Sequence, residues 1–134
     1  MTIHKVIKLF EGKSDFYANK KVCEYIRSFT VEGREGQENV VAATLEKISR
    51  IYGFDPRKCP QIKDEGNGVL RIGQDLKRII GFNTTEEKRF DFIALDCFRK
   101  PGQRRSKDQS KKYAKVARTK RNKNWKVVKR ECDL

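Results

Sequence analysis

The longest apolar pattern in the chain lies late in the sequence, at residues 90–98. This run is rich in aromatic and aliphatic residues and contains neither glycine nor proline, which is typical of a central strand covered on both faces. After Phe98 the apolar pattern stops, and Pro101 and Gly102 predict a turn among lysines and arginines. The sequence therefore predicts a rigid strand that leads into a basic loop.

Two earlier segments carry apolar residues at helical spacing. In the first, Ser14 is a candidate N-cap and the helix is expected to continue to about residue 30. In the second, residues 40–52, apolar side chains recur at positions i, i+4 and i+8, and Gly53 is a typical C-terminal residue. A glycine-containing turn joins the two segments. The sequence thus predicts a helical hairpin, which needs an apolar surface to cover.

The remaining segments predict strands and loops. Residues 4–10 alternate weakly and predict a short N-terminal strand, whereas residues 54–68 contain prolines and glycines and predict a loop. Residues 69–72 and 78–82 predict two short strands that precede the strand at 90–98. Their connecting turns are expected at residues 73–75 and 83–88. Three strands in succession with short connections predict an antiparallel meander.

Together these elements predict an α+β fold in one domain, residues 1–134. An N-terminal strand and the helical hairpin are expected to pack on a three- to five-strand, mainly antiparallel sheet. Because side chains alternate along a strand, Arg71 and Arg78 are expected to point away from their apolar neighbours. The open face of the sheet is therefore predicted to carry arginines.

The end of the chain predicts a basic helix followed by an extension, residues 118–134. The helix is expected at residues 108–117, with Ser106 as its cap. Residues 118–123 are almost continuously charged, which is typical of a solvated tail. Residues 125–128 instead predict a final edge strand or a docked terminus.

Charge narrows the class of partner. The chain carries a formal net charge of +14, and 37% of its residues are charged. A nucleic acid is the anionic polymer that fits best, and a membrane surface is the rival. However, no apolar stretch approaches the roughly 20 residues that cross a bilayer, and the N-terminus has no signal-peptide core. We therefore expect a cytoplasmic protein with no membrane partner.

The candidate metal ligands are scattered along the chain. The four cysteines are Cys23, Cys59, Cys97 and Cys132, and they form no C-x-x-C pair or cluster with the single histidine, His4. The sequence therefore predicts no metal site and no cofactor. In a reducing compartment all four cysteines are expected to remain thiols. His4 is expected to be a surface group on an edge strand, and a nuclease that uses two histidines is excluded by count.

The order of the expected elements resembles the RelE/ParE superfamily of bacterial toxins, most closely its phage-associated HigB-like subgroup. The resemblance is carried by the paired strands at residues 69–72 and 76–82 and by residues 92–100, where a strand ends in phenylalanine and is followed by cations and a helix. It covers most of residues 5–117. It implies a small cytoplasmic toxin that cleaves mRNA during translation on the ribosome and is neutralised by a cognate antitoxin. In nuclease members the ribose 2′-hydroxyl attacks the adjacent phosphate without a metal, leaving a 2′,3′-cyclic phosphate and a 5′-hydroxyl.

This chemistry requires a base, an acid and cations that stabilise the phosphorane. The candidate catalytic residues are four cations and a tyrosine: Arg71, Arg78, Lys100, Arg104 and Tyr113. By position, Arg78 matches the arginine on the second meander strand of the family, and Arg71 matches the basic residue on the strand before it. Tyr113 corresponds to a catalytic tyrosine of some members or else is a core aromatic under the last helix. Each arginine has a simpler alternative, a solvated charge on an open sheet face.

Further cations are candidates for RNA contacts, and these are Lys77, Arg99, Arg105, Lys107, Lys111 and Lys112. Which loop residue matches the phosphate-binding cation of the family stays open among Lys100, Arg104, Arg105 and Lys107. Two departures distinguish the chain: residues 118–134 have no counterpart, and the acid/base histidines of some HigB-like proteins are missing. Two alternatives therefore stand beside the nuclease, a non-catalytic RNA- or ribosome-binding protein and a ParE-like gyrase inhibitor.

Overall fold

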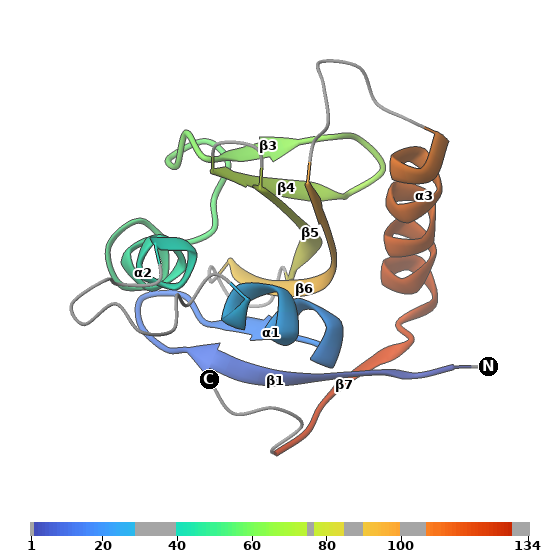
Figure 1. Ribbon diagram of the computed structural model, residues 1–134, viewed down its shortest axis with the longest axis horizontal. Helices are drawn as coiled ribbons and strands as arrows, with labels where there is room; N and C mark the ends of the chain where they lie inside the picture. Colours follow the sequence, from blue (N-terminus) through green and yellow to red (C-terminus); the bar gives the residue numbers. More distant parts are fainter. Residues whose placement is uncertain (1, 29–39, 75–76, 85–89, 100–106, 130–134) are drawn as a thin grey trace.

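A seven-stranded mixed sheet runs through the described part of the chain (Figure 1). The computed structural model describes residues 2–28, 40–74, 77–84, 90–99 and 107–129. The strands are β1 (His4–Phe10), β2 (Phe16–Ala18), β3 (Ile62–Asp64), β4 (Leu70–Gln74), β5 (Lys77–Thr84), β6 (Asp91–Arg99) and β7 (Trp125–Val127). They follow the order β3-β4-β5-β6-β2-β1-β7, and β2 with β6 and β1 with β7 are parallel pairs. The α+β class is confirmed and most strand pairs are antiparallel as expected, but the sheet has seven strands where three to five were predicted.

The predicted meander is confirmed as β4, β5 and β6, which pair antiparallel in succession. In the register, Arg71 lies opposite Ile80 and Arg78 lies opposite Phe98. β5 continues through Thr84, into the stretch expected to be a turn, and residues 75–76 and 85–89 lie outside the described residues. The long strand at residues 90–98 is present almost as predicted.

Two strands were not predicted. β3 lies within the expected loop and adds a short antiparallel strand beside β4. β2 lies within the expected first helix, so the Ser14 N-cap is wrong. Phe16 and Ala18 are fully buried on the sheet face that α1 and α2 cover, and β1 and β6 flank β2 on its two sides. Alternate burial over three residues fits a strand, and a segment this short looks the same as the start of a helix in the sequence.

The first of the two helices before the meander begins later than expected. Helix α1 (Lys20–Arg27) begins after Asn19, whose Oδ1 accepts a hydrogen bond from the Val22 N–H at 3.0 Å. Helix α2 (Val40–Lys47) continues into the π-helical turn η1 (Ile48–Tyr52). The chain leaves η1 at Gly53, which has a φ of 74° and donates its N–H to the Ile48 carbonyl at 2.7 Å. The second predicted helix and its terminal glycine are thus confirmed.

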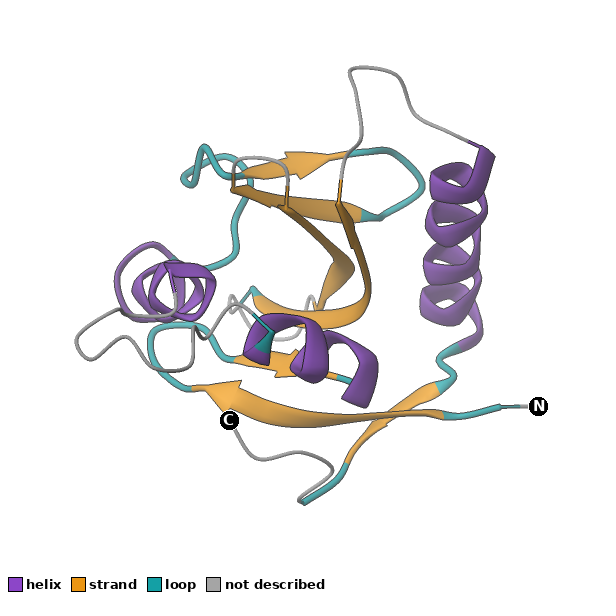
Figure 2. Cartoon of the chain, viewed as in Figure 1, coloured by secondary structure: helices purple, strands orange, loops and turns teal. Residues whose placement is uncertain are grey.

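The helices cover both faces of the sheet (Figure 2). Under α1 and α2, the rings of Phe16, Phe54 and Phe92 pack together, with centroids 5.4 to 5.7 Å apart. On the other face, helix α3 (Lys107–Asn122) places Val116 and Ala117 over apolar residues of β5 and β6. The arginine-bearing face is therefore partly covered, which corrects the expectation of an open face.

β7, which follows α3, forms one edge of the sheet. Residues 118–122 continue α3 and do not form a solvated tail, because Thr119 is buried on the inner side of the helix. Lys123, with a φ of 53°, ends the helix, and β7 then pairs with β1. The final edge strand is confirmed. His4 consequently lies on an inner strand, so its expected place on an edge strand is wrong.

A β-bulge changes the alternation of β6. Gly81 lies opposite Ala94 and Ile80 lies opposite Asp96, so Leu95 is an extra residue in β6. Side chains opposite one another across a strand pair lie on the same face. The bulge therefore turns Asp96 toward the face that α3 covers, together with Ile80.

Two further observations concern the cysteines and the possibility of membrane-spanning helices. Cys59 and Cys97 are free thiols, but Cys23 is disulfide-bonded, so the expectation of thiols is wrong at Cys23. Disulfides are typical of oxidising compartments. In the part of the chain that the structure describes, no helix is both long and apolar enough to cross a membrane.

Candidate functional site

Arg71 and Arg78 lie on the same face of the sheet. Arg71 is opposite Ile80, and Arg78 is two residues before Ile80 on β5. Ile80 belongs to the apolar cluster under α3, so both arginines point to that side, away from Ile72 and Ile79. The alternation predicted from the sequence is thus confirmed.

The Arg78 guanidinium lies over Gly73, its partner on β4. A Cβ built on Gly73 would stand 3.3 Å from Arg78 Nη1 and 3.4 Å from Cζ. The same Nη1 donates a hydrogen bond to the Lys77 carbonyl at 2.9 Å. A glycine on the neighbouring strand therefore leaves the space in which the guanidinium is held.

Arg71 is held by an acidic neighbour. Its Nε lies 3.3 Å from Glu65 Oε1, and each of the two side chains is only 17% exposed. Formally, the two arginines and this one glutamate leave one positive charge at the cluster. A partly buried positive charge attracts an anion more strongly than a fully solvated charge does.

The pKa of Arg78 depends on Arg71, Glu65 and two tyrosines. Burial lowers the pKa of Arg78 from its ordinary value, and Arg71 lowers it further. Tyr113, Tyr25 and Glu65 act in the opposite direction on the same pKa. An arginine remains protonated at any physiological pH. Arg78 therefore stays a cation. Both tyrosines contact Phe98, the residue opposite Arg78 on β6.

Tyr113 reaches the cluster from α3. Its ring is buried and lies edge-on to Phe98, with centroids 6.0 Å apart. The core-aromatic alternative is thus confirmed for the ring, and the catalytic role of the hydroxyl stays a prediction. Tyr25 of α1 donates its hydroxyl to the Phe98 carbonyl at 3.1 Å, and burial raises its pKa. Sequence analysis missed Tyr25, whose only signal is a polar-tipped ring next to the buried Ile26.

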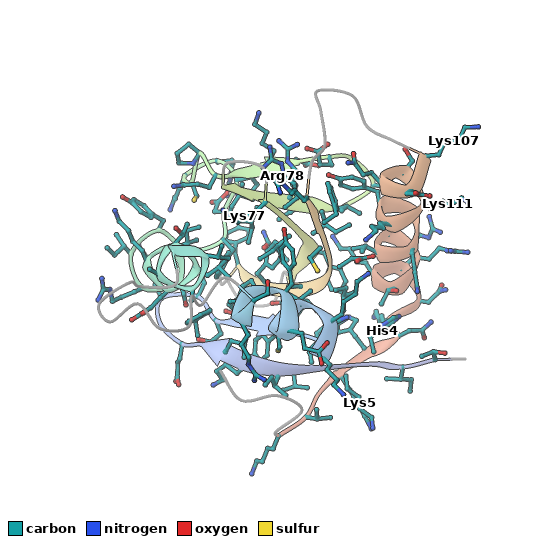
Figure 3. All side chains as sticks on the ribbon, in the orientation of Figure 1. His4, Lys5, Lys77, Arg78, Lys107 and Lys111 are labelled. Carbon is teal, nitrogen blue, oxygen red and sulfur yellow. The ribbon has the colours of Figure 1, made fainter. Side chains whose placement is uncertain are left out.

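The other predicted cations divide into three groups. Lys77 and Arg99 lie opposite each other at the ends of β5 and β6, on the face away from Arg78. Lys107 and Lys111 are exposed on the first turns of α3 (Figure 3). Lys112 is engaged within the protein: its Nζ donates to the Cys97 carbonyl at 3.0 Å and lies 3.5 Å from Asp96 Oδ1. Lys100, Arg104 and Arg105 lie outside the described residues.

His4 stands apart from the cluster. His4 lies near the end of α3 farther from Arg78 (Figure 3). Among the described residues, no three histidine, cysteine or acidic side chains are grouped so as to hold a metal ion. The cluster itself consists of Arg71, Arg78 and Glu65 with the hydroxyl groups of Tyr25 and Tyr113, which is the chemistry of an anion-binding site.

Comparison with known proteins adds no relative. No protein-family model, no curated protein and no solved structure matches this chain. The resemblance to the RelE/ParE superfamily therefore depends on the sequence pattern and the order of elements alone.

Proposed function

We propose that this protein is a ribosome-dependent endoribonuclease toxin of the RelE/ParE type, which binds mRNA at the cluster of Arg71, Arg78 and Tyr113. One observation carries the proposal: two partly buried guanidinium groups from neighbouring strands lie on one face of the sheet, beside a tyrosine from α3. The partners that it implies are translated mRNA and an antitoxin.

The order of elements supports the resemblance. The N-terminal strand, β1, is followed by two helices, α1 and α2, and then by the meander of β4, β5 and β6. A basic helix, α3, follows the last meander strand. β2, β3 and β7 are additions to that order, and they enlarge the sheet without changing the face on which Arg71 and Arg78 lie.

The proposed reaction breaks one bond of the RNA backbone. The ribose 2′-oxygen loses its proton and bonds to phosphorus, and the bond from phosphorus to the 5′-oxygen breaks as that oxygen gains a proton. The two guanidinium groups stabilise the extra negative charge on the phosphorane oxygens. Proton transfer is assigned to the Tyr113 hydroxyl and to Lys100, the lysine among the predicted catalytic residues. The buried Tyr113 ring is unsuited to stacking on a base.

A short induction in growing cells tests the proposal. We expect growth arrest and internal mRNA breaks, each with a 2′,3′-cyclic phosphate on one side and a 5′-hydroxyl on the other. Arg78→Ala should abolish both effects. Arg118→Ala is the matched control, because it removes an exposed positive charge from the outer side of α3. Undiminished arrest and cleavage with Arg78→Ala would overturn the assignment of the site.

A non-catalytic RNA-binding protein is the second candidate, and the burial of Tyr113 as a core aromatic favours it. In that case transcripts stay intact, while binding weakens by a similar amount for each cation removed and falls with added salt. Broken DNA with intact transcripts would instead identify a topoisomerase as the target. Mapping RNA and DNA ends in the same cells separates the three outcomes.

A further inference from the structure

A polar cavity lies where β1, α1, β6 and α3 meet. Its volume is about 100 Å³. Its polar lining consists of His4, Asn19, Lys21, Asp96, Lys115 and Thr119. A more open depression of about 250 Å³ shares His4 and Lys21 with it and adds Lys5 and Lys20. Figure 3 shows His4 and Lys5 together on β1, well away from Arg78.

The acidic residue of the cavity is already paired. Asp96 is buried, and its Oδ1 lies 2.6 Å from Lys21 Nζ and 3.5 Å from Lys112 Nζ. The Cys97 N–H also donates to this oxygen, at 2.9 Å. Pairing with Asp96 raises the pKa of Lys21 above its ordinary value. Asp96 therefore fixes Lys21 in the wall as a permanent cation.

The remaining charges leave the cavity positive. The cavity is lined by two ammonium groups, those of Lys21 and Lys115, and by the one carboxylate of Asp96, which Lys112 also approaches from outside the lining. Asn19 and Thr119 contribute polar surface, but their side chains donate to backbone carbonyls of the protein, at 2.8 and 3.0 Å. The cavity thus presents cations whose charge exceeds that of their acidic partner.

His4 stands among these cations. Burial lowers its pKa, Lys115 lowers it further, and Asp96 acts in the opposite direction. The other charged groups around it are Lys20 and Lys21 of α1, Lys5 of β1, and Lys126 of β7, which lies opposite Lys5. His4 is therefore neutral at pH 7, and an anion placed beside it would favour its protonation.

We propose that this cavity is a second anion site, which takes the phosphate group of a nucleotide or nucleic acid, with His4, Lys21 and Lys115 as its contacts. Three donors from three different elements suit the tetrahedral oxygens of a phosphate. A cavity of about 100 Å³ holds such a group but not a nucleoside. The lysine-lined depression at its mouth is where the sugar and base lie.

His4 reports on this site directly, because it is the only histidine in the chain. Its ring proton between the two nitrogens gives one resolvable NMR signal whose position follows protonation. On addition of inorganic phosphate or uridine 5′-monophosphate we expect a saturable shift and a raised pKa of His4. Once the titration of the phosphate probe itself is subtracted, binding should strengthen as the pH falls from about 7.5 to about 6, because the bound state takes up a proton at His4.

Lys115→Gln tests the geometry, since Lys115 is exposed and its loss should leave the fold intact. We expect about tenfold weaker phosphate binding, the loss of roughly one charged hydrogen bond. Lys63→Gln is the matched control, because Lys63 is exposed on β3 at the far edge of the sheet. It should change binding less than twofold.

A third variant tests whether the His4 cavity and the Arg78 cluster bind anions independently. Arg78→Ala should leave the His4 response to phosphate unchanged, whatever it does to RNA cleavage. Uncleavable 2′-O-methyl RNA that binds more tightly than the nucleotide would identify nucleic acid as the source of the phosphate, and the reverse order would identify the free nucleotide. A shift that never saturates, equal losses with Lys115→Gln and Lys63→Gln, or a response abolished by Arg78→Ala would each overturn the proposal.

Discussion

Gly73 and Arg78 depend on each other across two strands. Because Gly73 has no side chain, the guanidinium lies against the backbone of β4 and stays beside Arg71. The alternation rule predicted from sequence that both arginines share a face, since it needs only the order of residues along each strand. The same rule says nothing about Tyr25 or His4, whose neighbours come from other elements.

A methyl group at Gly73 should disturb RNA binding without unfolding the protein. Its Cβ would stand 3.3 Å from Arg78 Nη1, and a flexible side-chain end yields to such a contact. We expect Gly73→Ala to change the free energy of unfolding by less than about 1 kcal/mol. RNA affinity should fall several-fold, because the guanidinium moves from its position. Urea denaturation and RNA titration of the same preparation measure the two effects.

Gly81 provides the contrasting glycine. Its Cβ would lie 2.8 Å from the carbonyl carbon of Ile93 and 2.8 Å from Phe92 Cε1, at the bulge of β6. A paired backbone cannot move aside as a side chain does, so Gly81→Ala should cost about 3 kcal/mol or more in unfolding free energy. Equal destabilisation by the two glycine variants would contradict this distinction between backbone and side-chain contacts.

At the scale of elements, the start of α1 joins the helix to the sheet. The Asn19 side chain accepts from the Val22 N–H at 3.0 Å and donates to the Leu95 carbonyl at 2.8 Å, beside the bulge. Those two bonds fix where α1 begins. The sequence placed this start too early because Phe16 suits the apolar face of a helix as well as it suits a strand.

Removing both hydrogen bonds of the Asn19 side chain should destabilise the folded protein. Asn19→Ala is expected to lower the unfolding free energy by about 2 kcal/mol, roughly half from the helix cap and half from the bond to Leu95. Asn19→Asp keeps the cap acceptor and should show an intermediate loss. Ser28→Ala, at the exposed end of α1, is the control and should lose only a few tenths of a kcal/mol. Urea titration monitored by circular dichroism compares the three.

An element can be predicted from the sequence when the pattern that specifies it lies within a short segment. The meander and α2 carry their signals within a dozen residues, so they were predicted. β3 is only three residues long, so its sequence carries too weak a pattern to identify a strand. The pairing of β7 with β1 joins distant parts of the chain, and the local sequence of β7 does not specify that partner. The basic loop, with Lys100 and Arg104, lies outside the described residues, and its share of the site stays a prediction.

For the whole molecule, charge is the dominant property. A net charge of +14 makes the folded chain repel itself and attract polyanions. Composition alone predicted this class of partner. It could not predict that cations gather in two separate places, beside Arg78 and beside His4, because that depends on how β1, α1 and α3 meet.

Salt should therefore act on stability and on binding in opposite directions. Raising sodium chloride from about 0.05 to about 0.5 M shortens the screening length and relieves self-repulsion, so the Tm should rise. RNA affinity should fall over the same range, because each phosphate contact releases bound counterions. Thermal melts and RNA titrations at matched salt concentrations check the pair. A Tm that decreases with salt would show that attractive ion pairs outweigh the excess charge.

The parallel pairing of β1 with β7 has a consequence for how the protein is made. During synthesis β1 emerges from the ribosome long before β7, so its outer edge stays bare until nearly all of the described chain has been translated. The cavity around His4, which needs both β1 and the last turns of α3, cannot form on a nascent chain that stops short of them. A phosphate-binding surface assembled from β1 and α3 would thus become active only once α3 has emerged from the ribosome.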